Sequence, residues 1–170
     1  MKIKLNSDSM RSFFSVLLIT SSLSACVLVD SAAVSQLEGS WVSNCFHLDS
    51  GGYSTSRLTF TGGNFTQSTR TYNVTDNTCS SSVIGNEVTN GKFVVGALTG
   101  PVPSPTPSAN VAPAGNIDYN YLNGLRIFDV YRINGKQLQF GDKSVAVTNG
   151  TTSEKRPRVL ETNVAFQKVD

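Results

Sequence analysis

The sequence predicts an all-β domain: an antiparallel small barrel or a strongly bent sheet, with little helix. From Leu37 onward, short runs of alternating apolar and polar residues are separated by glycine-containing turns, which is typical of antiparallel strands. Two Asn-Gly pairs, Asn90-Gly91 and Asn134-Gly135, lie between β-prone runs, and this dipeptide favours the type I′ turn of a two-residue hairpin. No stretch of about a dozen residues repeats its apolar positions with the helical period.

The first half of the domain reads as one strand followed by a long hairpin. The first run covers 41–48, and Asp-Ser-Gly-Gly at 49–52 breaks it. Residues 57–61 (RLTFT) alternate, Gly-Gly at 62–63 supplies the positive φ that a tight turn needs, and 64–74 return. Because the returning run is long, polar and rich in threonine, we expect it to be an exposed or edge strand.

The second half predicts another hairpin and a final strand. Tyr131 and Ile133 alternate before Asn134-Gly135, and Leu138 and Phe140 alternate after it. The last run covers 159–169 (VLETNVAFQKV) and places three apolar side chains on one face, namely Leu160, Val164 and Phe166.

A proline-rich segment at 100–115 (GPVPSPTPSANVAPAG) separates the two halves and holds five of the six prolines. Proline lacks the N–H that a strand ladder needs and favours the extended polyproline II conformation. The β-prone runs on either side are too few for two separate cores, so we expect a projecting loop within a single domain. Two interpretations stay open: a solvated loop, or a partner-docking loop of the PxxP type.

The amino terminus has the pattern of a secretory signal peptide over residues 1–25. A cationic start precedes an apolar run at 13–19 and a segment of small residues. The apolar run is too short for a membrane-spanning helix, which needs about 20 residues. Cleavage would remove four charged residues from the chain: Lys2, Lys4, Asp8 and Arg11.

The mature chain is electrically neutral. Three of the 14 basic and one of the 12 acidic residues lie in the leader, which leaves 11 of each. Without a net positive charge or a basic cluster, the domain has no electrostatic footprint for nucleic acid or for anionic lipid. We expect no nucleic-acid partner.

Residues 23–26, Leu-Ser-Ala-Cys, resemble the lipobox of bacterial lipoproteins. The resemblance implies a diacylglyceryl thioether on Cys26, cleavage before it, and acylation of the new amino terminus, so that fatty acids such as palmitate anchor the protein. Two or more chains anchor a protein stably, since each buried CH₂ contributes roughly 0.8 kcal/mol. The alternative is an ordinary signal peptide that leaves Cys26 free.

The lipoprotein resemblance also predicts a location in the bacterial cell envelope. In lipoproteins of enteric-type bacteria, an Asp after the lipidated cysteine is associated with retention in the inner membrane, and here that residue is Val27. We therefore expect a lipid-anchored protein of the outer membrane. Residues 26–36 would form the lipidated amino terminus and tether, and residues 37–170 the single β domain.

The remaining two cysteines, Cys45 and Cys79, suit a disulfide in an oxidising compartment. Such a bond would close a loop of about 35 residues and stabilise the domain by roughly 4 kcal/mol in the chain-entropy model. The alternative is a metal site completed by His47, two residues from Cys45 on the same face of a strand. A zinc site normally has three or four protein ligands and the chain has no second histidine, so we expect no metal.

The motif LEGSWVSNC at 37–45, followed by SRLTFTGGNFTQ and TYNVTDNTC, resembles the opening of lipocalin-type barrels. It is more similar to lipocalin-like domains related to the APCDD1 extracellular domain and to bacterial lipoproteins. The resemblance implies an antiparallel barrel with Gly39 and Trp41 on the first strand and Cys45 bonded to Cys79. It also implies a structural Trp41 at the closed end, under an arginine for which the candidates are Arg156 and Arg158.

Enzyme constellations are sparse. The single histidine, His47, excludes most catalytic triads, no Gly-x-Ser-x-Gly elbow is present, and Asp76 reads as a turn or surface carboxylate. We expect neither catalysis nor a cofactor.

Two functions remain, and both place the protein at the membrane. The first is binding of a small apolar ligand, such as a lipid, inside the barrel. The second is a structural or protein-interaction role in the envelope without a ligand pocket. An eight-stranded barrel is wide enough either to hold one small ligand or to be filled by side chains. The candidate ligand residues are the aromatic side chains of the strands, Phe60, Phe93, Tyr119, Tyr121, Tyr131 and Phe140.

Overall fold

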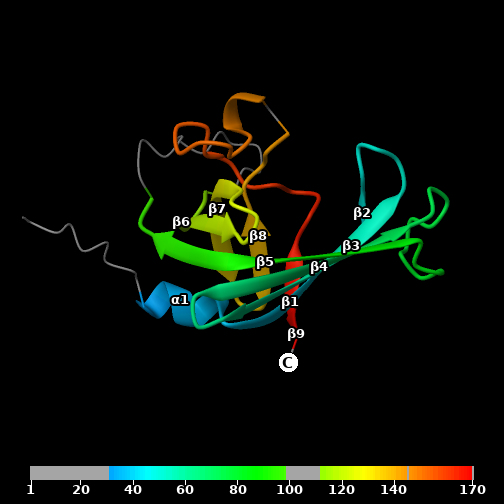
Figure 1. Cartoon of the computed structure of the whole chain (residues 1–170), viewed down its shortest axis with the longest axis horizontal. Helices are drawn as coiled ribbons and strands as arrows, with labels where there is room; N and C mark the ends of the chain where they lie inside the picture. The colour runs from blue at the N-terminus through cyan, green and yellow to red at the C-terminus, as the bar shows by residue number, and fades with distance from the viewer. Residues whose placement is uncertain (1–30, 99–111, 145, 170) are drawn as a thin grey trace, which may run out of the picture.

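The computed structural model describes residues 31–98, 112–144 and 146–169 (Figure 1). The expected signal peptide, Cys26 and residues 99–111 lie outside the described residues. The described part of the chain forms one α-helix, nine β-strands and one 3₁₀-helix. Their bounds are α1 (Ser31–Leu37), β1 (Gly39–Ser43), β2 (Phe46–His47), β3 (Tyr53–Thr61), β4 (Asn64–Tyr72), β5 (Gly85–Gly96), β6 (Gly115–Tyr121), β7 (Arg126–Asn134), β8 (Gln137–Phe140), η1 (Ala146–Thr148) and β9 (Phe166–Val169).

Eight strands close into an antiparallel barrel, which confirms the predicted fold class. The strand order is β1-β9-β8-β7-β6-β5-β4-β3, and β1 also pairs with β3 to close the ring. Trp41 marks the closure, since it is paired with Leu58 of β3 on one side and with Lys168 of β9 on the other. Closure satisfies backbone groups that an open sheet would leave at its edges.

The short strand β2 continues β1 after a bulge. Val42 pairs with Arg57 and Phe46 pairs with Ser54, so three residues between them on this segment face two on β3. An extra residue bends a strand and raises its local twist. Cys45 is one of the residues in this bend.

The barrel wall is extended on one side by a ribbon made of β3, β4 and β5 (Figure 1). β5 pairs with β4 from Gly85 onward but pairs with β6 only from Gly91 onward. The first part of β5 therefore projects past the end of β6. The expectation that residues 64–74 form an edge strand is wrong, because β4 lies between β3 and β5.

Asn90-Gly91 does not form a turn, so that prediction is wrong. Both residues lie in the middle of β5. A Cβ built on Gly91 would be 2.6 Å from Cε1 of Phe65 and closer still to the carbonyl oxygen of Asn120. The glycine is needed because the strand β6 and the ring of Phe65 approach its backbone, which is a second common reason for glycine within a strand.

The other two predicted hairpins form. Gly62 and Gly63 both have positive φ, 55° and 78°, between the paired residues Thr61 and Asn64, as a type I′ turn requires. At the second hairpin, Asn134 is the last residue of β7, and the turn is Gly135-Lys136. Here the glycine, at φ 60°, is the first of the two central residues, which is the glycine position of a type II′ turn.

The helix α1 covers the closed end of the barrel. Residues 31–36, expected as part of a tether, form most of this helix, and Ala33 and Val34 pack against the core. Leu37 and Trp41 are fully buried, and the indole Nε1 donates a hydrogen bond to the Leu37 carbonyl at 2.7 Å. With seven residues α1 is short, and no helix in the described ranges is long and apolar enough to span a bilayer.

The cation over Trp41 is a lysine of the last strand. The Nζ atom of Lys168 lies 5.1 Å from the centre of the indole ring. Arg156 instead forms an ion pair with Asp118, and Arg158 is exposed, so the expected arginine partner is wrong. The Trp41 side chain is a core residue, as the resemblance implied.

The final strand is shorter than predicted. β9 covers only Phe166–Val169, and Leu160 forms an isolated bridge with Gly141 after β8. The segment between β8 and β9 is otherwise irregular, and Pro157 in it is fully buried. Apolar and polar residues do alternate over 159–169, but only Phe166–Val169 form a strand.

Candidate functional site

The barrel contains a cavity of about 770 Å³ on the side of the 122–125 turn, away from α1. This volume lies within the range of small-molecule sites, roughly 300–1,000 Å³. No described residue of α1 lines it, because the aromatic core closes that end. The lining combines three kinds of side chain: apolar and aromatic groups, hydroxyl and amide groups, and charged groups.

The six predicted ligand residues divide into two groups. Tyr119, Tyr121 and Phe140 line the cavity. The other three fill the core: Phe60 and Phe93 stack edge to face with ring centres 4.9 Å apart, and Tyr131 is 5% exposed. Alternation in a strand identifies the inward face, but it does not tell which inward side chains border an empty space.

The aromatic part of the lining is a connected set of rings. Tyr119 lies 6.1 Å from Phe140, and Phe140 lies 5.5 Å from Phe166, with the planes of each pair steeply inclined. Tyr121 joins them through Phe65, which is edge to face with both tyrosines. Edge-to-face rings hold one another in place, so this floor is preorganised. Leu58, Ile127 and Val164 complete the apolar lining near it.

The wall formed by β3, β4 and β5 is polar near the mouth and apolar toward α1. Along β3 the inward positions run from Ser54 and Ser56 to Leu58 and Phe60. The inward residues of β4 and β5 also change from polar near the mouth to apolar toward α1. Their polar cavity residues are Gln67, Thr69, Glu87 and Thr89, and their buried apolar residues are Phe65, Phe93 and Val95. This explains the polar, threonine-rich sequence of β4 that suggested an edge strand.

Hydroxyl groups of this wall bond to one another. The hydroxyls of Ser56 and Thr69 lie 2.9 Å apart, and the Gln67 amide donates to the Thr69 hydroxyl at 3.4 Å. These side chains can turn toward a polar ligand group at small cost, because hydroxyls both donate and accept.

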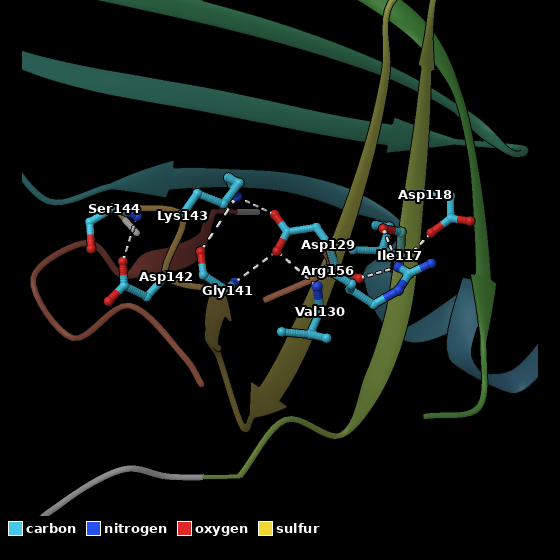
Figure 2. A network of polar contacts seen from close by, with 9 residues as sticks. All are labelled: Ile117, Asp118, Asp129, Val130, Gly141, Asp142, Lys143, Ser144 and Arg156. Atoms are coloured by element: carbon cyan, nitrogen blue, oxygen red, sulfur yellow. Dashed lines mark hydrogen bonds and ion pairs between the residues drawn. The ribbon is translucent and has the colours of Figure 1, made fainter. Parts of the chain in front are cut away.

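A buried carboxylate, Asp129, lies where the cavity meets the segment after β8 (Figure 2). Its side chain is 3% exposed, and its Oδ1 accepts hydrogen bonds from the backbone N–H groups of Val130 at 2.8 Å and Gly141 at 3.0 Å. The ammonium of Lys143 pairs with Oδ2, and the Lys143 side chain is 37% exposed. A Cβ on Gly141 would lie 2.6 Å from Oδ1, so glycine leaves room for this contact.

The two cavity tyrosines stay neutral. Burial raises the pKa of Tyr119 well above its usual value, and the negative charge of Asp129 adds to this shift. Burial and Asp129 also raise the pKa of Tyr121. Both phenols are therefore available as hydrogen-bond donors or acceptors at neutral pH, and neither serves as a base.

Arg156 fixes the segment after β8 to the outer face of the barrel (Figure 2). Its Nη1 atom pairs with the Asp118 carboxylate at 2.6 Å and donates to the backbone carbonyl of Asp129 at 2.6 Å. The guanidinium also lies 5.5 Å from the ring centre of Phe128. Asp129 is thus held through its side chain by Lys143 and through its carbonyl by Arg156.

A disulfide joins the bend after β1 to the loop after β4, which confirms the predicted bond. The Cα atoms of Cys45 and Cys79 are 5.7 Å apart. Asp76 organises the same loop: its carboxylate accepts hydrogen bonds from the Ser81 N–H at 2.8 Å, the Ser81 hydroxyl at 2.6 Å and the Thr78 hydroxyl at 3.0 Å. These bonds hold the pKa of Asp76 well below its usual value, so it is a structural carboxylate.

The two residues weighed in the sequence as a metal site, His47 and Cys45, do not line the cavity. His47 is exposed on β2 and packs edge to face with Tyr53, at 5.2 Å. Its neighbour Cys45 is bonded to Cys79 and so is not a metal ligand. The described residues contain no group of three or more His, Cys, Asp or Glu placed to hold a metal ion.

Sequence reasoning missed the polar part of the lining. The signal was present on β3, where Ser56 has the same parity as Leu58 and Phe60. Asp129 likewise has the parity of Ile127 and Tyr131 on β7, whereas its pairing with Lys143 carried no signal, because it depends on the turn of the chain after β8. Comparison of the chain with protein-family models, curated proteins and solved structures found no match.

Proposed function

We propose that this protein is a lipid-anchored lipoprotein of the bacterial cell envelope whose barrel binds a small, largely apolar ligand. The observation that carries the ligand-binding part is the cavity of about 770 Å³ floored by Tyr119, Phe140 and Phe166. A barrel of this size that is filled by its own side chains has no room for a ligand. Preformed concave sites with an apolar floor and a few polar groups are the usual form of small-molecule sites.

The anchor rests on the sequence around Cys26, and metabolic labelling tests it. Cells that express the full-length protein with radiolabelled palmitate should yield a labelled, membrane-bound product. Cys26→Ser should remove the label and release the protein from the membrane. Cys45→Ser is the matched control, because that cysteine lies in the folded domain and should keep the label. An unlabelled, soluble wild-type protein would rule out the anchor.

Native mass spectrometry of the protein purified from its host envelope tests the ligand. We expect a small molecule that co-purifies and dissociates on activation. Thr69→Phe, which fills the cavity, should lose it, whereas Thr66→Phe on the outward face of the same strand should keep it. Mass spectra without an added ligand mass, together with no binding of added lipids, would contradict the proposal.

A second function is favoured by apolar side chains exposed on the ribbon. They belong to the loop after β4 and to β5, namely Val74 (67% exposed), Val83 (43%), Ile84 (66%) and Val88 (54%). Exposed apolar groups that gather on one region are typical of contact surfaces between proteins. An empty cavity, combined with an envelope protein whose cross-linking is lost in Ile84→Ser, would favour this interaction role.

A further inference from the structure

The cavity carries more negative than positive charge, and from this we infer the class of its ligand. We propose that the barrel binds an amphiphile with a cationic head, such as an alkylamine, whose apolar part lies on the aromatic floor and whose head lies near the mouth. This inference rests on the ligand-binding function proposed above. It adds the sign of the ligand's charge and the direction in which the ligand enters.

The site is defined by the cavity itself. The charged side chains of its lining determine which ligand head group it accepts. Four carboxylates line the cavity, and they come from four separate segments: Asp49 before β3, Glu87 on β5, Asp129 on β7 and Glu161 before β9. Lys143 is the one cation among the lining residues that the structure describes. The carboxylates therefore come from separate parts of the lining and together set the potential of the cavity.

Lys143 does not offset the excess negative charge, because its ammonium is paired with Asp129. The three other carboxylates, Asp49, Glu87 and Glu161, form no ion pair with any described residue. Asp49 and Glu87 are exposed at the mouth, and Glu161 is half-buried and accepts a hydrogen bond from the Asn163 N–H at 2.8 Å. A cationic head at this place would face carboxylates without displacing an internal partner.

The floor suits the same ligand. The aromatic rings of the floor offer a large apolar contact area to the ligand's chain. Tyr119 and Tyr121 are neutral and contribute hydroxyl groups to the lining, as Ser56 and Thr69 also do. An ammonium carries three N–H donors, which match this set of oxygen acceptors.

An anionic lipid fits the cavity poorly. A fatty-acid carboxylate would meet the carboxylates at the mouth, and like charges brought together in a partly desolvated site repel. Its natural partner, Lys143, would first have to leave Asp129, and a buried carboxylate without its partner is costly. The geometry therefore selects against the ligands that a merely apolar barrel would accept.

Calorimetric titration of the full-length protein in neutral detergent, with detergent alone as the blank, tests the inference. Three ligands share one chain and differ in the charge of the head: hexylamine, hexanol and hexanoate. We expect hexylamine to bind about tenfold tighter than hexanol and hexanoate to bind more weakly than both, as partly exposed charges each contribute up to about 1 kcal/mol. Raising the salt concentration should shrink the preference.

Two charge variants and one cavity variant complete the test. Asp49→Asn with Glu87→Gln should abolish the preference for hexylamine and leave hexanol unchanged. Glu38→Gln with Glu154→Gln removes the same charge from carboxylates that do not line the cavity, and should keep the preference. Thr69→Phe should weaken all three ligands.

The outcomes separate this inference from the proposed function. Equal binding of the three ligands, lost in Thr69→Phe, overturns the cationic head and leaves the ligand-binding barrel standing. A preference for hexylamine that persists in Thr69→Phe places the amine outside the cavity and overturns the inference. Absence of binding for all three ligands, with no co-purifying molecule, removes the proposed function and this inference together.

Discussion

Asp129 and Asp76 are carboxylates with little exposed surface, and each is held by a different set of donors. Asp129 combines two backbone N–H groups with the ammonium of Lys143, whereas Asp76 has only hydroxyl and N–H donors from the loop that it organises. Loss of the Lys143 ammonium would leave Asp129 as a buried charge without its ion-pair partner. The neutral donors around Asp76 favour its charged form.

Removal of the Lys143 ammonium should destabilise the fold. In Lys143→Met the buried Asp129 loses its cation, and we expect the free energy of unfolding to fall by about 1–2 kcal/mol, since Lys143 itself is partly exposed. Denaturant unfolding measures this change. Lys155→Met, at an exposed position, is the control and should be within about 0.5 kcal/mol of wild type. An equal effect of the two variants would show that the ion pair contributes nothing.

Asp76 should make the stability depend on acid pH. Its folded-state pKa is below the usual value of 3.8, so its bonds stabilise the fold above that value and the stabilisation is lost as pH falls below about 4. Denaturant unfolding measured from about pH 6 down to about pH 2.5 covers this transition. The free energy of unfolding should fall more steeply with decreasing pH in wild type than in Asp76→Asn. Parallel pH profiles of the two proteins would contradict this role.

At the scale of the strands, β5 has the most distinctive sequence requirement. It pairs with two strands along its length: residues 85–90 pair only with β4, Gly91 and Lys92 pair with both β4 and β6, and 93–96 pair only with β6. Gly91 stands at the position where β6 joins, and the ring of Phe65 packs against it. The change from a projecting ribbon to a barrel wall thus occurs at a residue without a side chain.

Substitution of Gly91 should damage this junction. In Gly91→Ala the new methyl group would overlap Phe65 and the backbone of β6, and we expect a loss of about 1–3 kcal/mol in the free energy of unfolding. Thermal unfolding checks it. Gly96→Ala is the matched control on the same strand, since no atom lies within 4 Å of its added Cβ. Similar melting temperatures for the two variants would argue against the close approach at Gly91.

At the scale of the whole molecule, the two ends of the barrel differ: one is closed and the other is open. α1, Trp41 and the buried rings fill one end, and the cavity occupies the other. The disulfide ties the Asp76 loop, which follows β4, to the bend after β1.

Loss of the disulfide should weaken the molecule without opening the barrel. Cys45→Ser with Cys79→Ser should lower the free energy of unfolding by roughly 2–4 kcal/mol, because the unfolded chain regains the freedom of the loop between them. The far-ultraviolet circular dichroism of the folded state should stay that of a β protein, since β1 remains paired with β3 and β9. A fully unfolded variant would show that the ring of strands depends on the bond.

Local patterns in the sequence were reliable where neighbouring residues alone decide the structure. Gly62-Gly63 predicted its turn because two successive positive φ angles need no distant partner. Asn90-Gly91 carried a similar local signal, yet it lies in a strand, because long pairings with β4 and β6 outweigh the preference of two residues. The polar residues of β4 led to the wrong prediction of an edge strand for a similar reason. Several of them face a cavity that only the closed barrel creates.

The sequence by itself determined the antiparallel β class, the hairpin at Gly62-Gly63, the inward positions of several strands, and the two cysteines that bond. These features follow from alternation, glycine placement and cysteine number, which act within a few residues or need only a partner of the right type. The tertiary structure alone decided the closure of the ring, the division of the aromatic residues between core and cavity, and the Asp129–Lys143 pair. Closure of the barrel pairs Trp41 with Lys168, two residues that are far apart in the sequence. The shape of the space inside a barrel depends on all its strands at once.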